Sequence, residues 1–196
     1  MIRIDSPRVL HKRAEAASLA TIDEKHAFRT LREWMAVQGL SVEPQRQVVP
    51  AAPGLLVGTW SLVSCYAFRR NGHMMPIYGP RPEGRLFYDA SGNMSVHIMQ
   101  SGRPRFQDPE KFRATEPEMR LAYRTYEAYF STYEVDAEHS LIRHHVHGGL
   151  FPNWTGTVQS RYYRFDGPDR LILSTEPIGA LPTRKAIVIL EWARLA

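Results

Sequence analysis

Cysteine is almost absent from this sequence. Cys65 stands alone among 196 residues, so the chain cannot form an internal disulfide. It falls inside the apolar run 60–68, where a buried thiol behaves as a small hydrophobic side chain. We therefore favour a structural role for Cys65 over a nucleophilic one.

Long hydrophobic runs are missing as well. No stretch approaches the roughly 18 apolar residues that a membrane-spanning helix needs. Charges interrupt the first 20 residues, where a signal peptide requires an apolar segment. We expect a cytoplasmic protein that makes no contact with a membrane.

Positive charge exceeds negative charge without being concentrated. The chain has 25 Lys and Arg against 20 Asp and Glu, a net charge of +5. The basic residues are scattered from Arg3 to Arg194, whereas nucleic-acid-binding proteins cluster them on one element. No nucleic-acid partner is therefore expected. Phosphate loops, dinucleotide fingerprints, paired zinc cysteines and a Ser-His-Asp order are also missing, so we expect no cofactor.

The first part of the chain has helical signals. Residues 1–40 read as a helical extension, with a capping box at 21–24 and a helix stop at Gly39. Three prolines within 41–54 indicate an extended linker. Two short helices cannot bury an apolar stripe alone, so this extension docks on the following domain, caps it, or forms a homodimer.

The composition changes after the linker. From residue 55 to 196, short runs rich in Val, Ile, Tyr, Phe and Trp alternate with Gly and Asn turns, which is typical of antiparallel strands. We predict a mainly β, antiparallel barrel domain over 55–196. The predicted strands are 58–68, 84–88, 94–99, 141–147, 157–165, 170–174 and 185–192.

One segment breaks the strand pattern. Met119, Tyr123, Tyr126, Tyr129, Phe130 and Tyr133 recur at spacings of three and four. This spacing predicts one helical insertion over 116–133, packed by its aromatic stripe. We expect this helix to plug or flank one end of the barrel.

Several motifs of the predicted barrel resemble a known family. They are the Gly58-x-Trp60 opening strand, the segments 84–88 and 92–95, the histidine stretch 144–147, and Phe151-Pro152-Asn153-Trp154-x-Gly156. In order and spacing, residues 56–194 are similar to the bacterial lipocalin-like domain family. The resemblance implies a barrel that encloses an apolar ligand, with Trp60 closing its floor and Arg194 packing on that indole. It names no single reaction, since small barrels of this kind serve as isomerases, cyclases and pericyclases.

The histidines could carry chemistry. On a strand, His145 and His147 face one side and His144 the other. A His-x-His pair can hold two corners of a metal site, but no third ligand is evident and His97 lies on another strand, so no metal is expected. A buried neutral imidazole could instead act as a general acid or base.

The direction in which Arg161 points bears on the kind of ligand that the barrel binds. It shares a strand face with Gln159 and Tyr163, while Val158, Ser160 and Tyr162 share the other face. Alternation alone does not say which face lines the interior. A guanidinium inside the barrel would need a carboxylate or a ligand oxyanion as its partner.

Three functions remain open. The first is binding of a small, largely apolar molecule followed by its cofactor-independent isomerisation or cyclisation in specialised metabolism, with His144 or His145 as acid and base. The predicted substrate-binding residues are Tyr133, Asn153, Trp154, Gln159, Arg161 and His97. The alternatives are a non-catalytic carrier or sensor of a small hydrophobic ligand, and an interaction module that works through its N-terminal helices.

Overall fold

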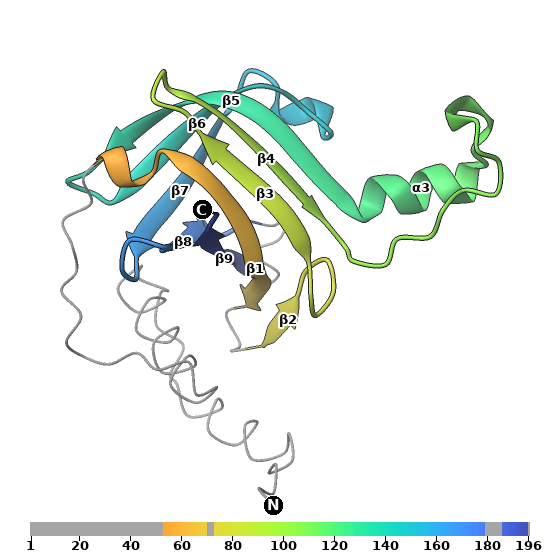
Figure 1. The fold of residues 1–196 in the computed structure, drawn as a ribbon, viewed down its shortest axis with the longest axis horizontal. Coiled ribbons are helices and arrows are strands. Elements are labelled where there is room, and N and C mark those ends of the chain that lie inside the picture. Colours follow the sequence, from red (N-terminus) through yellow and green to blue (C-terminus); the bar gives the residue numbers. More distant parts are fainter. Residues whose placement is uncertain (1–52, 70–72, 179–185, 196) are drawn as a thin grey trace, which may run out of the picture.

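The computed structural model describes residues 53–69, 73–178 and 186–195 (Figure 1). The fold is mainly β, with one short α-helix among these residues. The strands are β1 (Gly58–Arg69), β2 (Met74–Pro76), β3 (Glu83–Tyr88), β4 (Asn93–Met99), β5 (Tyr126–Asp136), β6 (Leu141–Gly149), β7 (Val158–Phe165), β8 (Arg170–Thr175) and β9 (Ala186–Arg194). The helix is α3 (Glu116–Arg124), and 3-10 turns occur at η1 (Pro53–Leu55), η2 (Lys111–Arg113) and η3 (Pro152–Trp154).

All neighbouring strands pair antiparallel. The order is β2-β1-β3-β4-β5-β6-β7-β8-β9, and the pairing of β9 with β1 closes eight of these strands into a barrel (Figure 1). The short β2 is an addition that pairs with the end of β1. The seven predicted strands are confirmed, with ends shifted by at most two residues. Closure follows from the sequence pattern, because alternating apolar residues on every strand need one shared interior.

The predicted helix over 116–133 is wrong beyond Arg124. The helix ends there, and Tyr126, Tyr129 and Tyr133 lie on the long strand β5, which pairs with both β4 and β6. Tyrosines three and four residues apart fit a helix, but they also fit a strand in which Tyr129 and Tyr133 share one face. The strand is favoured because this segment forms backbone hydrogen bonds with a neighbouring strand on each side, and because aromatic residues favour β structure.

Helix α3 does not plug the barrel. It projects away from the end where β4 and β5 meet, and none of its residues is buried (Figure 1). Thr115 and Glu118 form a capping box that starts it. The predicted N-terminal helices, and with them the homodimer contact, lie outside the described residues, as does all but the end of the predicted linker. Among the described residues, no helix is long and apolar enough to cross a membrane.

One end of the barrel is closed by Trp60. Its side chain is fully buried, and its Nε1 donates a hydrogen bond to the Leu56 backbone oxygen at 3.0 Å. The Arg194 guanidinium lies 4.1 Å from the indole centroid and donates to the backbone oxygens of Leu55 and Val57. The cation on the ring, which the family resemblance implied, is confirmed.

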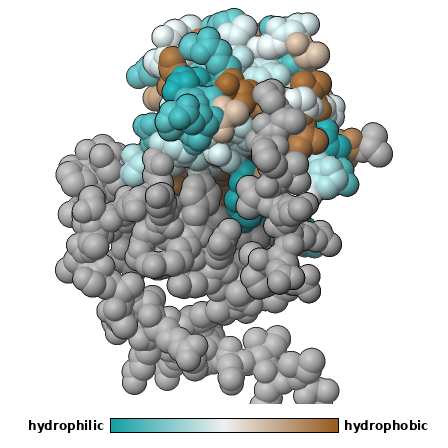
Figure 2. All heavy atoms as spheres, turned by 90° about the vertical axis from the view of Figure 1, so that its left-hand side faces the viewer, coloured by the Kyte–Doolittle hydropathy of each residue, from teal (hydrophilic) through white to brown (hydrophobic). Residues whose placement is uncertain are grey.

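The apolar core fills the space beside this floor. Cys65 is part of it, at 2% exposure, and burial raises the pKa of its thiol to about 12, which confirms the structural role. The outer surface of the described part carries both hydrophobic and hydrophilic residues. On the face shown in Figure 2, the hydrophobic residues of the described part form small separate patches among hydrophilic ones.

Candidate functional site

Strand register assigns the inward-facing residues. Side chains directly opposite on neighbouring strands point to the same side of a sheet. His144 on β6 is opposite Tyr133 on β5 and Gln159 on β7, and it is only 1% exposed, so these three positions face the interior. Arg161 lies two residues along β7 from Gln159 and therefore faces the interior too.

A hydrogen-bonded set of three side chains lies inside the barrel. His144 Nε2 is 2.8 Å from the Tyr88 hydroxyl, and His144 Nδ1 is 2.8 Å from the Tyr129 hydroxyl. Tyr88 ends β3 and Tyr129 lies in the middle of β5, and both are buried. Three different strands thus hold one imidazole between two phenols.

All three groups are electrically neutral near pH 7. Burial lowers the pKa of His144 well below its usual value, and the charges of Arg161 and His145 lower it further. Burial raises the pKa of Tyr88 well above its usual value and also raises that of Tyr129. The Arg161 cation opposes the increase at both phenols without cancelling it, and at Tyr129 it also acts through a side-chain hydrogen bond to the hydroxyl.

Counting protons shows what this set can bind. A neutral imidazole has one N–H donor and one acceptor nitrogen, so one phenol donates to His144 and the other accepts from it. The accepting phenol still carries its own O–H proton. Among the residues that the structure describes, no acceptor other than His144 lies within hydrogen-bonding distance of either hydroxyl. One phenolic proton is therefore free to bind an oxygen atom of a ligand.

Arg161 adds positive charge to the same interior. Its Nη1 donates to the Ser160 backbone oxygen at 2.8 Å. No carboxylate of the described residues lies within 4.0 Å of its guanidinium. Its charge nevertheless acts on Tyr88, Tyr129, His144 and Glu127. The guanidinium thus has hydrogen-bond donors that no protein carboxylate uses.

Glu127 supplies the matching negative group. It lies on β5 opposite Ile98 and two residues from Tyr129, so it faces inward. Burial raises the pKa of this carboxyl group, while Arg161 lowers it. Its Oε1 accepts a hydrogen bond from the Ala128 N–H at 3.1 Å.

Aromatic rings surround this polar set. The Tyr88 and Tyr133 rings meet edge to face at 4.8 Å between centroids, and Tyr129 and Trp154 do so at 5.6 Å. Trp154 belongs to η3 and packs against the core. The Tyr133 hydroxyl donates to the Asp89 backbone oxygen at 2.8 Å, so its contribution to a ligand would be its ring.

The other predicted site residues lie elsewhere. His145 is on the outer face of β6, 3.5 Å from Glu134, and His97 is on the outer face of β4, 3.0 Å from the Tyr126 hydroxyl. Asn153 is exposed in η3. Gln159 faces inward, with its amide nitrogen 3.2 Å from the Thr157 hydroxyl. Of the eight predicted residues, Tyr133, His144, Trp154, Gln159 and Arg161 are grouped around the interior.

Sequence reasoning missed Tyr88, Tyr129 as a binding residue, and Glu127. A signal existed for the last two, because Glu127, Tyr129 and Tyr133 occupy alternate positions of a run that also fits a strand. Tyr88 ends a predicted strand, but nothing local indicates that its partner is a histidine 56 residues later.

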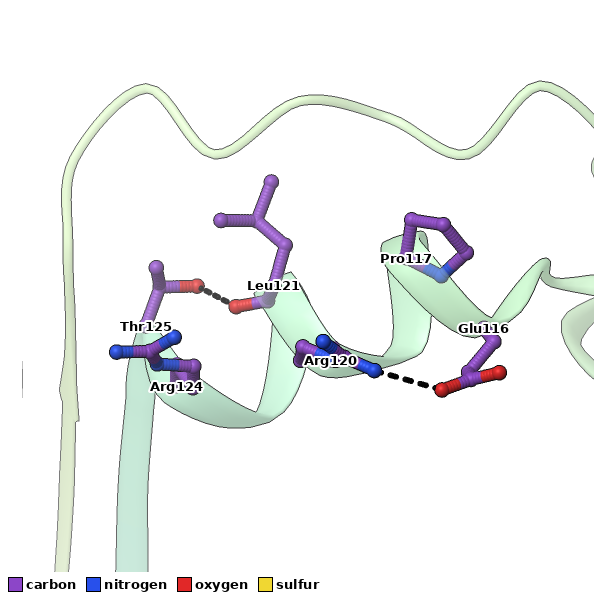
Figure 3. Close-up of a pocket in the computed structure, with 6 residues that line it drawn as sticks. All are labelled: Glu116, Pro117, Arg120, Leu121, Arg124 and Thr125. Atoms are coloured by element: carbon purple, nitrogen blue, oxygen red, sulfur yellow. Dashed lines mark hydrogen bonds and ion pairs between the residues drawn. The ribbon is translucent and has the colours of Figure 1, made fainter.

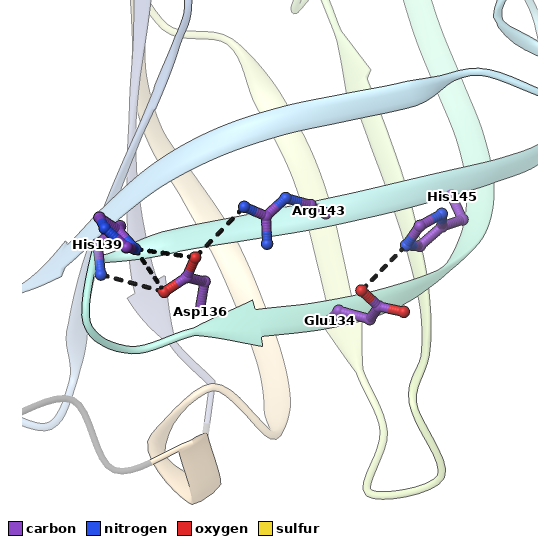
Figure 4. Close-up of polar contacts among 5 residues, drawn as sticks. All are labelled: Glu134, Asp136, His139, Arg143 and His145. Carbon is purple, nitrogen blue, oxygen red and sulfur yellow. Dashed lines mark hydrogen bonds and ion pairs between the residues drawn. The ribbon is translucent and has the colours of Figure 1, made fainter.

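The outer face of β5 and β6 has its own polar contacts. Figure 4 shows Glu134 beside His145, and Asp136 beside His139 and Arg143. Hydrogen bonds from His139 lower the pKa of Asp136. These pairs are largely exposed to solvent, where ion pairs contribute little. No group of three metal-ligating side chains occurs among the described residues.

A pocket also lies against α3, outside the barrel. Its lining is Glu116, Pro117, Arg120, Leu121, Arg124 and Thr125 (Figure 3). Glu116 and Arg120 form an exposed ion pair at 2.7 Å, and Thr125 donates to the Leu121 backbone oxygen. None of the inward-facing polar groups is here, so the interior set remains the candidate site.

The chain is similar to several known proteins. Over 88 residues, 42% of this chain and 78% of the relative, the chain is 36% identical to the 4'-hydroxy-3'-methoxypropiophenone carrier protein ppsC of Aspergillus oryzae (strain ATCC 42149 / RIB 40). Among solved structures, it matches a redesigned β-barrel, b11L5F_LGL, with a TM-score of 0.38 and 9% identity over 74% of this chain and 96% of the other. It matches EF1p2_mFAP2b bound to DFHBI with a TM-score of 0.37 and 12% identity over 74% and 98%.

The family model of the lipocalin-like domain matches residues 57–195. This span contains every strand of the barrel and all residues of the interior set. The chain belongs to the lipocalin-like domain family.

Proposed function

We propose that this protein is a non-catalytic carrier of a small aromatic molecule that bears an acceptor oxygen such as a ketone. The ligand lies inside the barrel, with that oxygen bound by the free phenolic proton of the Tyr88–His144–Tyr129 set. This set carries the proposal, because a buried donor without an acceptor is unfavourable until a ligand supplies one.

Two further observations support an aromatic ligand. The rings of Tyr88, Tyr129, Tyr133 and Trp154 offer edges and faces beside the polar set. The relative from Aspergillus oryzae is named as the carrier of an aryl ketone with hydroxyl and methoxy groups, all of which contain acceptor oxygens.

The same geometry favours carriage over isomerisation or cyclisation. A general base must accept a proton, and the pKa of His144 is held well below its usual value by burial and by the positive charge of Arg161. Both ring nitrogens are occupied by neutral phenols rather than by a carboxylate that would stabilise an imidazolium. Protonating His144 would therefore be costly, whereas hydrogen bonding to a ligand needs no proton transfer.

The test is a calorimetric titration of the full chain with 4'-hydroxy-3'-methoxypropiophenone. We expect one reversible site and recovery of the ligand unchanged. Tyr88→Phe and Tyr129→Phe each remove a hydroxyl from the set, so each should weaken binding about 2-fold to 10-fold, the range for one neutral hydrogen bond.

Tyr126→Phe is the matched control. Tyr126 lies on the same strand as Tyr129, but its hydroxyl contacts His97 on the outer face, so its removal should leave affinity unchanged. Equal affinities for all four proteins would contradict the proposed site. Conversion of the ligand into a product at a rate that depends on His144 would contradict the carrier function.

A further inference from the structure

Two oppositely charged side chains face the barrel interior without touching each other. Glu127 projects from β5 and Arg161 from β7, on either side of β6. Each forms a hydrogen bond with the backbone next to it, Glu127 with the Ala128 N–H and Arg161 with the Ser160 oxygen. Their charges interact, yet no oxygen of Glu127 lies within 4.0 Å of the guanidinium.

Both groups keep unused hydrogen-bonding capacity in the empty protein, because Glu127 bonds only the Ala128 N–H and Arg161 bonds the Ser160 oxygen and the Tyr129 hydroxyl. Charged groups that are withdrawn from water need a partner or a hydrogen bond in compensation. Both groups are half-buried, and burial raises the pKa of Glu127. A ligand with a donor for the carboxylate and an acceptor for the guanidinium would satisfy both at once.

We propose that Glu127 accepts a hydrogen bond from a hydroxyl group of the bound aromatic ligand while Arg161 donates to an oxygen of the same ligand, so that the barrel selects phenols. This inference rests on the proposed carrier function and deepens it. Glu127 is then the residue that determines specificity, because its carboxylate accepts a hydrogen bond from a hydroxyl group and an ether has no hydrogen to donate.

The spacing along β5 fits one aromatic ring. Glu127 and Tyr129 are two residues apart on the same face, about 7 Å along the strand. This is close to the separation of polar substituents at opposite ends of a benzene ring. One end of such a ligand reaches the carboxylate, and the other reaches the phenols that contact His144.

The hydroxyl group of Tyr78 lies near Glu127 without a hydrogen bond to it. Burial raises the pKa of Tyr78, which lies between β2 and β3, and the negative charge of Glu127 raises it further. No hydrogen bond between Tyr78 and Glu127 occurs among the described residues. The carboxylate thus keeps acceptor capacity for a ligand.

Two probe ligands that differ by one hydrogen-bond donor test the inference. They are 4'-hydroxy-3'-methoxypropiophenone and 3',4'-dimethoxypropiophenone, titrated calorimetrically into the full chain. The wild-type protein should prefer the phenol by about 10-fold to 100-fold, as expected for a hydrogen bond to a charged group. Glu127→Gln should reduce this preference, and Glu127→Leu should abolish it while retaining affinity for the ether.

Glu134→Gln is the matched control, because Glu134 lies on the outer face of the same strand beside His145 and should leave the preference intact. Thermal unfolding of each variant checks folding, because removing Glu127 also removes an attraction to the half-buried Arg161, and the two ligands are compared within each folded variant. Equal binding of both ligands by the wild-type protein would overturn the selection of phenols and leave the carrier function standing. Binding of neither ligand would overturn both.

Discussion

His144 is held by hydrogen bonds at both ring nitrogens, with Tyr88 at one and Tyr129 at the other. Three neutral polar groups therefore occupy a barrel interior that is otherwise mainly apolar. The hydrogen bonds among these three groups leave one phenolic O–H without an acceptor, and Arg161 adds further donors. At the scale of single residues, this surplus of donors is what turns a packed core into a binding site for an oxygen-bearing ligand.

The low pKa of His144 makes stability depend on pH. In the folded protein the pKa of His144 lies well below 6.5, whereas in the unfolded chain the imidazole titrates near its usual value. Below pH 6.5 the unfolded state binds a proton that the folded state refuses, so the free energy of unfolding falls as pH decreases. We expect His144 to contribute up to about 1.4 kcal/mol per pH unit between pH 6.5 and its folded pKa.

Denaturant unfolding between pH 4.5 and 7.5 measures this contribution. His144→Gln should flatten the decline below pH 6.5, while His147→Gln, at an exposed position on the opposite face of β6, serves as the control. A decline of the same slope in wild type and His144→Gln would show that this histidine is not buried in its neutral form.

Only part of the site was predictable residue by residue, because His144 and Arg161 were among the predicted residues and Tyr88, Tyr129 and Glu127 were not. His144 and Arg161 carry chemistry that a β-strand rarely buries, and alternation groups Arg161 with Gln159. Which face points inward was not predictable, because it depends on the register between β6 and β7. Glu127 was missed for another reason: a carboxylate between tyrosines looks like part of a solvated helix until the strand is recognised.

At the scale of elements, β5 decides the architecture of the site. It supplies Glu127, Tyr129 and Tyr133 to the interior and pairs with β4 and β6. The sequence predicted the other long strands because their apolar residues alternate and their ends carry turn residues. It failed for β5 because aromatic spacing fits two periods, and only the long-range pairing distinguishes them.

Gly149 sets how closely β6 approaches β5. A Cβ atom at this position would lie 2.8 Å from both the Ala128 backbone oxygen and the Tyr129 Cβ, with no flexible side chain to move away. Gly149→Ala should therefore displace β5 at Tyr129, lower the free energy of unfolding by about 1–3 kcal/mol and weaken ligand binding.

Urea denaturation and the ligand titration together check this expectation. Gly54→Ala is the matched control, because a Cβ atom there would meet nothing within 4 Å. Unchanged stability and affinity in Gly149→Ala would contradict the close approach of β5 and β6 at this position.

At the scale of the whole molecule, the ends of the barrel differ. One end is closed by Trp60, and Arg194 packs on this ring. Arg194 also connects two other segments at this end. Its guanidinium donates to Leu55 in η1, and its Nε donates to the Pro168 oxygen in the loop before β8 at 3.1 Å. The helix α3 and the turn η3 belong to the opposite end (Figure 1). The closed end stabilises the fold, and Tyr88 of the polar set lies at this end of β3, opposite Gly58 on β1.

Arg194 should be important for stability and not for the ligand. Arg194→Met removes the cation from the Trp60 ring and three hydrogen bonds to backbone oxygens, so we expect a loss of about 2–4 kcal/mol in the free energy of unfolding. Arg120→Met on the exposed face of α3 should change stability by less than about 0.5 kcal/mol. If the two variants unfold at the same urea concentration, Arg194 does not tie the barrel together.

The central claim is that the interior donors bind a ligand oxygen and leave the ligand chemically unchanged. A single NMR experiment addresses both parts: the carbonyl ¹³C resonance of labelled 4'-hydroxy-3'-methoxypropiophenone is followed over hours in the presence of the full chain and of Tyr129→Phe. The account predicts a bound resonance shifted downfield by hydrogen bonding, a smaller shift in Tyr129→Phe, and constant total intensity. A bound resonance that is identical in the two proteins, or intensity that moves into a new product, would contradict it.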